Sequence, residues 1–317
     1  MKPTFTIIAP IYNEHECLPE LYKRVKTTLD TTGEAWEFIL VDDGSRDGST
    51  DIIRELAQED SRVRPVIFAR NFGHQIAVTA GMDYSRGDAV IVIDADLQDP
   101  PEVILQLIAK WREGYQVVYA VRTEREGETW FKTMTASLFY RLIYRITEVK
   151  IPMDSGDFRL LDRRVVNVMN SMRERHRFLR GMSSWAGFRQ IGVPYRRAAR
   201  FAGSTKYPLR KMLRLAENAV TGFSYFPLQL ASYLGFISAV IGILLIPVVA
   251  YLRLFTAHQE LVGQATTLIV VMLFCGVQLI CLGIMGEYIG RIYDEVKGRP
   301  LYTVSQDPAD FPHADEN

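Results

Sequence analysis

Acidic side chains follow several apolar stretches of the sequence, and carboxylates placed in this way can hold a cation. One stretch runs into Tyr12-Asn13-Glu14, another into Asp42-Asp43-Gly44-Ser45, and a third into Asp94-Ala95-Asp96-Leu97-Gln98. If these stretches are neighbouring strands, the carboxylates gather at one edge of a sheet. Such gathering costs free energy unless a cation or hydrogen-bond donors offset it. The pattern therefore predicts a hard divalent metal and a polar ligand for it to hold.

The metal prediction centres on Asp94 and Asp96, with Gln98 beside them. Their oxygens are the ligands that Mg²⁺ or Mn²⁺ prefers, and Mg²⁺ commonly bridges to substrate phosphates. An EF-hand is excluded because, counted from Asp94, the sixth loop position is Asp99 instead of Gly and the twelfth is Leu105 instead of Glu. A D-x-D pair alone is common by chance, so the prediction depends on its neighbours.

Composition and missing motifs narrow the function further. The chain has 317 residues with 37 Lys+Arg against 37 Asp+Glu, and this balance argues against a general nucleic-acid binder. Its cysteines, Cys17, Cys275 and Cys281, cannot build a disulfide scaffold. The sequence has neither a G-x-x-x-x-G-K-[ST] motif nor a G-x-G-x-x-G motif, so kinase-like ATP use and nicotinamide binding lose support. A metal-bridged diphosphate suits a nucleotide-sugar donor.

The elements that must position these residues alternate between strand and helix in the first 225 residues. Short apolar runs predict strands at 5–10, 37–41, 65–68, 89–93 and 116–120, with helices near 16–30, 49–59, 74–84 and 101–112. Nearly continuous apolar runs indicate strands buried on both faces of a mostly parallel sheet. We therefore expect a doubly wound α/β domain over residues 1–225, with its ligand at the carboxyl ends of the strands.

The remainder of the chain predicts a membrane hairpin. Residues 226–252 and 265–286 carry no charge, and each run exceeds the roughly 20 residues that span a bilayer. We expect transmembrane helices at about 226–252 and 265–289, followed by a tail over 291–317 that is disordered from Ser305 onward.

Charge around the hairpin predicts its orientation. Cations precede the first span and follow the second, whereas the loop between the spans is nearly free of them. The positive-inside rule then places the catalytic domain and both termini in the cytoplasm, on the inner (plasma) membrane. Arg200 and Lys206 in the first flank have a purely anchoring interpretation under this rule. Residues 208–223 project as an amphipathic helix for the membrane interface, and residues 131–149 are a second, weaker candidate.

Several motifs together resemble family 2 glycosyltransferases of the polyprenyl-phosphate branch, to which dolichol-phosphate mannose synthase is related. The motifs are Pro10-x-Tyr12-Asn13-Glu14, Val41-Asp42-Asp43-Gly44-Ser45-x-Asp47-Gly48, Arg70-Asn71-Phe72-Gly73 and the run from Asp94 to Glu102. The hairpin ending in Gly286-Glu287-Tyr288-Ile289-Gly290 looks like the bacterial GtrB and ArnC type. The resemblance covers residues 3 to about 304. It implies a GT-A type domain, a nucleotide-diphosphate sugar donor, an undecaprenyl phosphate acceptor and inversion at the sugar.

The resemblance also implies roles for individual residues. The nucleotide site would be lined by Pro10, Tyr12, Glu14, Asp43 and Asp94. The metal would be held by Asp94, Asp96 and Gln98. Asp157 would face the reacting centre and join Asp94 and Asp96 as the catalytic set. The phosphates of donor and acceptor would meet Arg122, Lys132, Arg200 and Lys206.

Some of these residues also have plain structural interpretations. Asp157 and Arg159 would make a surface ion pair, and Tyr12 would serve packing. His74, which follows Gly73, is interpreted as a helix-start residue with no ligand.

Three functions compete on this sequence. The first is transfer of a hexose to a membrane polyprenyl phosphate, with UDP-glucose as the leading donor and GDP-mannose or UDP-4-amino-arabinose derivatives as others. The second is a processive polysaccharide synthase, which should show a Q-x-x-R-W acceptor motif and enough transmembrane spans to form a polymer channel. It is disfavoured because the chain has no Arg-Trp dipeptide and only two predicted spans. The third is a non-catalytic membrane scaffold. It is disfavoured because a scaffold does not require acidic residues at the edge of a sheet. The sequence leaves the oligomeric state open, a homo-oligomer included.

Overall fold

The computed structural model of the chain describes residues 2–122, 155–196, 224, 226–255 and 264–311. The chain divides into two compact units. Of the described residues, the first contains 2–122, 155–196 and 299–311, and the second contains 224, 226–255 and 264–298.

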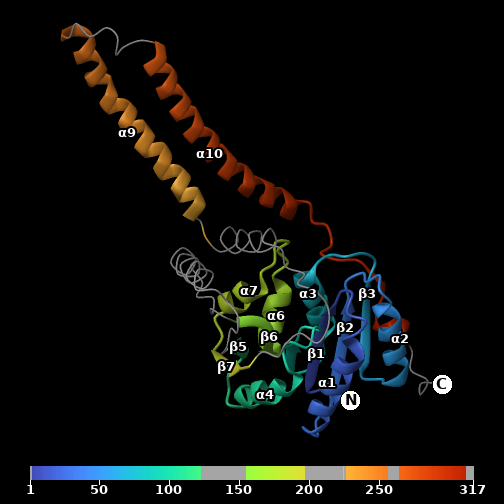
Figure 1. Cartoon of the computed structure of the whole chain (residues 1–317). Helices are drawn as coiled ribbons and strands as arrows, with labels where there is room; N and C mark the ends of the chain where they lie inside the picture. The colour runs from blue at the N-terminus through green and yellow to red at the C-terminus, as the bar shows by residue number, and fades with distance from the viewer. Residues whose placement is uncertain (1, 123–154, 197–223, 225, 256–263, 312–317) are drawn as a thin grey trace. The chain divides into compact units, whose positions relative to one another are not determined.

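The first unit is built around a sheet that contains all of the predicted strands. These are β1 (Phe5–Ile11), β2 (Trp36–Asp42), β3 (Val63–Phe68), β4 (Ala89–Val92) and β5 (Val117–Arg122). β1 lies between β2 and β4 and is parallel to both, and β2 is parallel to β3. The carboxyl ends of these central strands therefore meet at one edge, as predicted for the acidic motifs (Figure 1).

Further strands make the sheet mixed. They are β6 (Ser155–Asp162), β7 (Gln190–Tyr195) and β8 (Val304–Gln306), and the order across the sheet is β7-β5-β6-β4-β1-β2-β3-β8. β6 is inserted antiparallel between β4 and β5, whereas β7 is parallel to β5. This insertion brings the start of β6, with Asp157, to the carboxyl end of β4.

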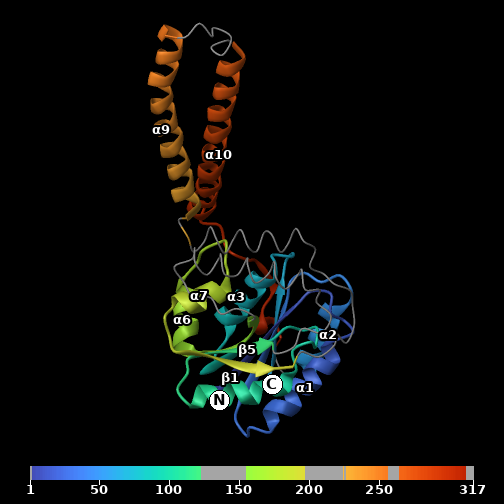
Figure 2. The ribbon, with the colours of Figure 1, turned by 60° about the vertical axis from the view of Figure 1, so that its left-hand side comes forward.

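Helices cover both faces of the sheet, as expected for a doubly wound domain. They are α1 (Leu18–Asp30), α2 (Ser49–Glu59), α3 (His74–Tyr84), α4 (Ile104–Arg112), α6 (Arg163–Ser171) and α7 (Leu179–Trp185). The odd-numbered side chains of β1, from Phe5 to Ile11, share a buried core with α1, α2 and α4. The opposite face meets α3, and a Cβ at Gly81 would come within 2.3 Å of the Ile8 side chain. Figure 2 shows α3, α6 and α7 on the side of the sheet away from α1.

The second unit consists of two long apolar helices, α9 (Phe226–Phe255) and α10 (Gln264–Val296). By length and composition, Phe226–Val248 and Val270–Val296 are each able to cross a membrane. Little of either is buried in the protein, 6% and 0% respectively, so they do not have the surroundings of soluble core helices. The two predicted apolar helices are thus present, and α10 continues past the predicted end at 289.

The expectation that the tail is disordered from Ser305 is wrong for the residues that the structure describes. After α10 the chain rejoins the first unit, where β8 pairs antiparallel with β3 at the edge of the sheet. The Tyr302 ring stacks on Phe68 at 5.1 Å, and Arg54 donates to Gln306 at 2.8 Å. A short strand gains order from edge pairing and aromatic packing even where its composition is polar. Residues 312–317 lie outside the described part, as do the predicted interfacial helices at 131–149 and 208–223.

Candidate active site

The loops that follow β1 and β2 are joined by hydrogen bonds. Asn13, with φ of 55°, donates its backbone N–H to Ser45 Oγ at 3.0 Å, and the Glu14 N–H donates to Ser49 Oγ at 3.0 Å. Pro10 is buried at the end of β1, whereas Tyr12 is 41% exposed. Tyr12 follows directly after β1, at the sheet edge where a ligand is expected.

Asp43 anchors the loop that leads into α3. Its carboxylate accepts the Phe72 N–H at 2.6 Å and the Gly73 N–H at 2.9 Å. Burial raises the pKa of Asp43, although these two hydrogen bonds oppose the rise. Gly44 has φ of 72° and a Cβ there would lie 2.8 Å from the Arg70 carbonyl carbon, so this close approach requires glycine. Asp43 thus fixes the start of α3 relative to β2.

One carboxylate oxygen of Asp94 is buried and has no hydrogen-bond donor among the described residues. Its Oδ1 accepts no hydrogen bond there, and the nearest cation is the ring of His74 at 3.7 Å. Burial, together with Asp99 and Asp157 nearby, raises the pKa of Asp94 to about 6, while His74 opposes the rise. A buried carboxylate oxygen without a donor fits coordination by a hard cation.

The loop after Asp94 is tightly turned. Asp96 accepts the Gln98 N–H at 3.1 Å, and Leu97 between them has φ of 57°. In the described part of the chain no three His, Cys, Asp or Glu side chains gather into a ready metal site. Mg²⁺ needs only one or two carboxylates when substrate phosphates complete its shell. Asp94 and Asp96 therefore fit a metal that arrives with a diphosphate.

Asp157, near the start of β6, is held by side chains from two helices. Its Oδ1 accepts Arg180 Nε at 2.8 Å, and its Oδ2 lies 3.1 Å from His74 Nε2 and 3.2 Å from Gln75 Nε2. The side-chain oxygen Oε1 of Gln75 accepts the Leu179 N–H at 3.0 Å, which ties the start of α3 to the start of α7. Burial alone would raise the pKa of Asp157, but Arg180 and His74 outweigh it and hold this pKa well below its usual range.

His74 joins two of the three carboxylates that the resemblance places in the catalytic set, Asp94 and Asp157. It begins α3, as the sequence predicts, but its ring also lies between Asp157 and Asp94. Burial would lower the pKa of His74, yet the two aspartates raise it to about 9. At neutral pH the ring is therefore a cation between two anions. The interpretation of His74 as a helix-start residue and nothing more missed this placement.

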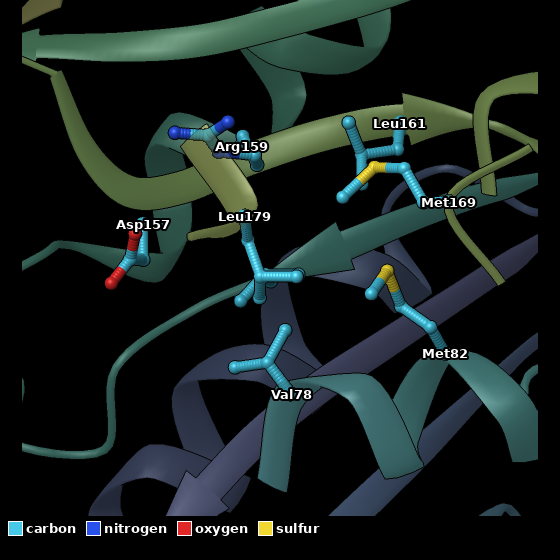
Figure 3. A pocket seen from close by; sticks show the side chains of 8 residues that line it. Val78, Met82, Asp157, Arg159, Leu161, Met169 and Leu179 are labelled. Carbon is cyan, nitrogen blue, oxygen red and sulfur yellow. The ribbon is translucent and has the colours of Figure 1, made fainter. Parts of the chain in front are cut away.

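The suggested ion pair between Asp157 and Arg159 is absent from the described ion pairs. Asp157 pairs with Arg180, and Arg159 is buried, donating to Ser183 Oγ at 2.7 Å and to the Gly156 carbonyl at 3.0 Å. Asp157 also lines a small, largely apolar cavity, whose other lining side chains include Val78, Met82 and Leu179 (Figure 3). Apolar surroundings of this kind strengthen the electrostatic contacts of Asp157.

Of the cations implied for the phosphates, only Arg122 lies in the described part of the chain. It ends β5, and its guanidinium Nε donates to Tyr195 Oη at 3.3 Å. Lys132, Arg200 and Lys206 lie outside the described residues.

Comparison with known proteins agrees with this architecture. Residues 6–169 match the model of glycosyl transferase family 2, a range that contains Asp43, His74, Asp94, Asp96 and Asp157. The chain is 52% identical over 302 residues to the uncharacterized glycosyltransferase YkcC of Bacillus subtilis (strain 168), covering 95% of this chain and 93% of that protein.

Two further relatives carry more specific names. The chain is 41% identical over 303 residues to the SfII prophage-derived bactoprenol glucosyl transferase of Shigella flexneri, covering 95% of this chain and 97% of that protein. It is 39% identical over 303 residues to the prophage bactoprenol glucosyl transferase homolog of Escherichia coli (strain K12), covering 95% and 98%. These matches favour an enzyme over a non-catalytic scaffold. With its GT-A type mixed sheet covered by helices on both faces, the chain is a glycosyltransferase that belongs to family 2.

Proposed function

We propose that the enzyme transfers a hexose from a nucleotide-diphosphate sugar to the phosphate of undecaprenyl phosphate, with glucose from UDP-glucose as the first candidate. The observation that carries the proposal is the meeting of Asp94 and Asp157 around His74, with a buried oxygen of Asp94 open to a cation. The names of the bactoprenol glucosyl transferases among the relatives support the acceptor and the sugar. The apolar helices α9 and α10 would keep the enzyme beside a lipid substrate.

Mg²⁺ or Mn²⁺ would be held by Asp94 and Asp96, and Gln98 in the same loop would be a further oxygen ligand. When bound, such an ion neutralises negative charge on the diphosphate as it leaves. Tyr12, exposed at the end of β1, together with Pro10, Glu14 and Asp43, would form the base and ribose site. Arg122, Lys132, Arg200 and Lys206 would supply the remaining positive charge around donor and acceptor phosphates.

The acceptor explains why Asp157 need not act as a strong base. A sugar hydroxyl must lose a proton as it attacks, whereas a phosphate monoester has a second pKa near 6 and is already largely a dianion at pH 7. The depressed pKa of Asp157 makes it a poor proton acceptor at that pH. Its fixed carboxylate instead suits alignment of the acceptor or stabilisation of positive charge on the sugar ring. Direct displacement from an α-linked donor then gives a β-linked lipid product.

We place the catalytic unit and both termini in the cytoplasm, with the loop between α9 and α10 on the far side of the inner membrane. A Gln259→Cys variant, in a chain whose native cysteines are replaced, tests this orientation, although Gln259 lies outside the described residues. A membrane-impermeant thiol reagent should label it in intact cells. Labelling only after lysis would reverse the orientation.

The decisive assay combines membranes containing the full chain with undecaprenyl phosphate and a panel of radiolabelled nucleotide sugars. We expect one labelled sugar per lipid, and no transfer by the Asp157→Ala variant. A product that grows with time into a polymer would favour a processive polysaccharide synthase. Transfer of no sugar to the lipid by the wild type, across the panel, would refute the proposal.

A further inference from the structure

Arg122 is joined to a buried pair of side chains that the sequence did not single out. Arg122 ends β5, and Tyr195 stands opposite it at the end of β7 in the parallel register. The guanidinium Nε donates to the Tyr195 hydroxyl oxygen at 3.3 Å. The Tyr195 hydroxyl in turn donates to Oδ1 of Asp99. Asp99 lies at the end of the loop that begins at Asp94.

Asp99 needs these partners because it is completely buried. A buried carboxylate is costly unless hydrogen bonds and a countercharge compensate for its lost water. Tyr195 supplies a hydrogen bond, and Arg122 Nη2 lies 4.0 Å from Asp99 Oδ1. The ends of β4, β5 and β7 are thereby tied together through polar groups.

The guanidinium of Arg122 also passes close to the backbone that carries Asp157. A Cβ at Gly156 would lie 3.0 Å from Arg122 Nη2, which is tighter than an ordinary contact. Burial would lower the pKa of Arg122, but Tyr195, Asp99 and Asp94 outweigh it, so the cation lies within electrostatic reach of Asp94. Glycine at 156 therefore leaves room for the Arg122 guanidinium beside the backbone that precedes Asp157.

We propose that Tyr195 and Asp99 are positioning residues that hold the Arg122 guanidinium across Gly156, where it binds the β-phosphate of the donor's nucleoside diphosphate. An arginine at the end of a strand has many rotamers, and ordering it before the ligand arrives lowers the entropy lost on binding. The inference deepens the proposed function in its donor half, and it is independent of the acceptor.

A double-mutant cycle tests whether Tyr195 acts through Arg122. Titration calorimetry on the detergent-solubilised full chain with Mn²⁺ measures the Kd of UDP, and of GDP in parallel, for the wild type, Tyr195→Phe, Arg122→Ala and the double variant. We expect Tyr195→Phe to raise the diphosphate Kd roughly five- to tenfold, as loss of one hydrogen bond to an ordered group predicts. The double variant should bind no worse than Arg122→Ala, since Tyr195 has nothing left to position.

The matched control and the second probe separate positioning from a general loss of structure. Tyr119→Phe removes a hydroxyl from the same strand as Arg122 and should leave the Kd unchanged. UMP or GMP, which lack the β-phosphate, should bind Tyr195→Phe as tightly as the wild type. If Tyr195→Phe does not fold, Gly156→Ala replaces it, because its Cβ would lie 3.0 Å from Arg122 Nη2 and press on the guanidinium while the Tyr195 hydroxyl is kept.

Additive effects in the cycle, an unchanged diphosphate Kd, or equal weakening of mono- and diphosphate binding would each overturn the inference. A wild type that binds neither diphosphate would overturn it as well. If the wild type binds a diphosphate but transfers no sugar to undecaprenyl phosphate, only the proposed acceptor fails, and the cycle still decides this inference.

Discussion

The ring Nε2 of His74 lies 3.1 Å from Oδ2 of Asp157, although the two residues are 83 positions apart in the chain. The same atom is 3.7 Å from Oδ1 of Asp94. One imidazolium therefore offsets the repulsion between the carboxylates of Asp94 and Asp157. The backbone position of His74 is fixed by Asp43, whose carboxylate accepts the N–H of the preceding residue, Gly73.

Replacing His74 should therefore lower turnover. In His74→Ala the carboxylates repel each other without compensation and Asp157 loses a partner, so we expect kcat to fall by about tenfold to a hundredfold, as misplacement of a reacting group does. His74→Gln keeps a donor but no charge and should be intermediate. Steady-state kinetics with UDP-glucose and undecaprenyl phosphate would decide. Wild-type kcat in both variants would return His74 to a plain helix-start residue.

Arg180 allows a matched comparison with another arginine. Arg180 pairs with Asp157 at 2.8 Å, whereas Arg173 pairs with Asp83 at 2.9 Å on a more exposed part of the same unit. Arg180→Ala should reduce kcat roughly a hundredfold because Asp157 is no longer held. Arg173→Ala removes a surface pair of little energetic weight and should leave kcat near wild type. Equal losses in the two variants would show that Arg180 serves only stability.

The metal is tested by binding and stability as well as by rate. In Asp94→Asn the buried unpartnered oxygen no longer belongs to an anion, so the metal-free variant should unfold at a higher temperature than the wild type. Mn²⁺ should raise the unfolding temperature of the wild type and leave that of Asp94→Asn unchanged. Thermal unfolding with and without EDTA measures both effects. Full activity of the wild type in excess EDTA would contradict the metal assignment.

Much of the fold follows from the sequence because its central strands are buried on both faces. β1 to β5 are short apolar runs, and the acidic motifs mark where β1, β2 and β4 end. β6 was missed because Asp157 and Arg159 interrupt its apolar pattern, and tertiary partners compensate both charges. β8 is only three residues long and forms because β3 offers it an open edge.

The sequence allows individual residues of the candidate site to be predicted, but not the contacts that these residues make with one another. The resemblance singles out Asp94, Asp96 and Asp157, yet His74 and Arg180 have no local signal for their contacts. Both contacts depend on how β6 inserts beside β4, which brings distant segments together. The sequence does not indicate a role for Tyr195 either. Its strand, β7, contains Gly192 and Pro194 and lacks a clear strand pattern.

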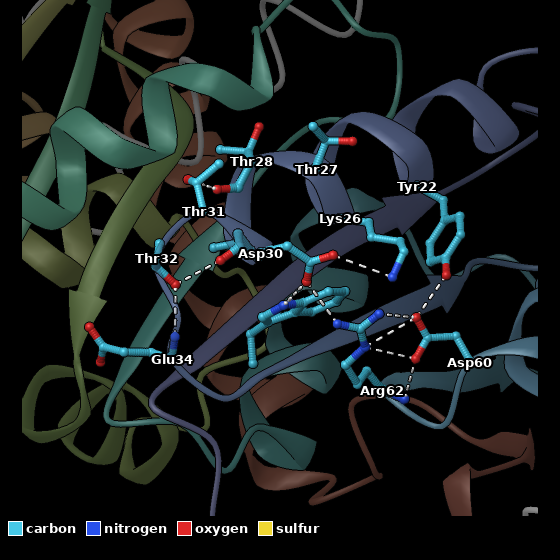
Figure 4. Close-up of polar contacts among 12 residues, drawn as sticks. Tyr22, Lys26, Thr27, Thr28, Asp30, Thr31, Thr32, Glu34, Asp60 and Arg62 are labelled. Carbon is cyan, nitrogen blue, oxygen red and sulfur yellow. Dashed lines mark hydrogen bonds and ion pairs between the residues drawn. The ribbon is translucent and has the colours of Figure 1, made fainter.

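An acid-sensitive contribution to stability lies away from the active site, at Asp60 (Figure 4). Its carboxylate accepts Arg62 Nη2 and Tyr22 Oη, each at 2.7 Å. Burial would raise the pKa of Asp60, but Arg62 and Tyr22 lower it to about 2. Because the folded-state pKa lies below the unfolded one near 4, the stabilisation of about 1–2 kcal/mol is present above pH 4 and lost as the pH falls toward 2.

Asp60→Asn should accordingly unfold roughly 2–6 °C below the wild type at pH 7. The difference should shrink as the pH is lowered from 5 to 3. Asp51→Asn, which loses only an exposed pair with Arg54, should show almost no difference at either pH. A difference between Asp60→Asn and wild type that stays constant with pH would mean that the Asp60 charge does not contribute.

The pH dependence of turnover separates an activated acceptor from an enzymic base at Asp157. Because its pKa is held well below the usual range, Asp157 stays ionised throughout an assay from pH 5 to 8. At saturating metal, the rate should rise through pH 6 as the acceptor phosphate loses its second proton. Asp157→Asn should lower this profile without moving its midpoint.

The acceptor itself provides the sharpest control. A polyprenyl phosphonate has a higher second pKa than the phosphate, so the midpoint of the rate profile should move upward with it in the wild type and in Asp157→Asn alike. Titration of an enzyme group would instead leave the midpoint in place when the acceptor is changed. If the midpoint stayed fixed and Asp157→Asn abolished the rising limb, Asp157 would be a general base. The attack would then need proton removal, which a phosphate dianion does not require.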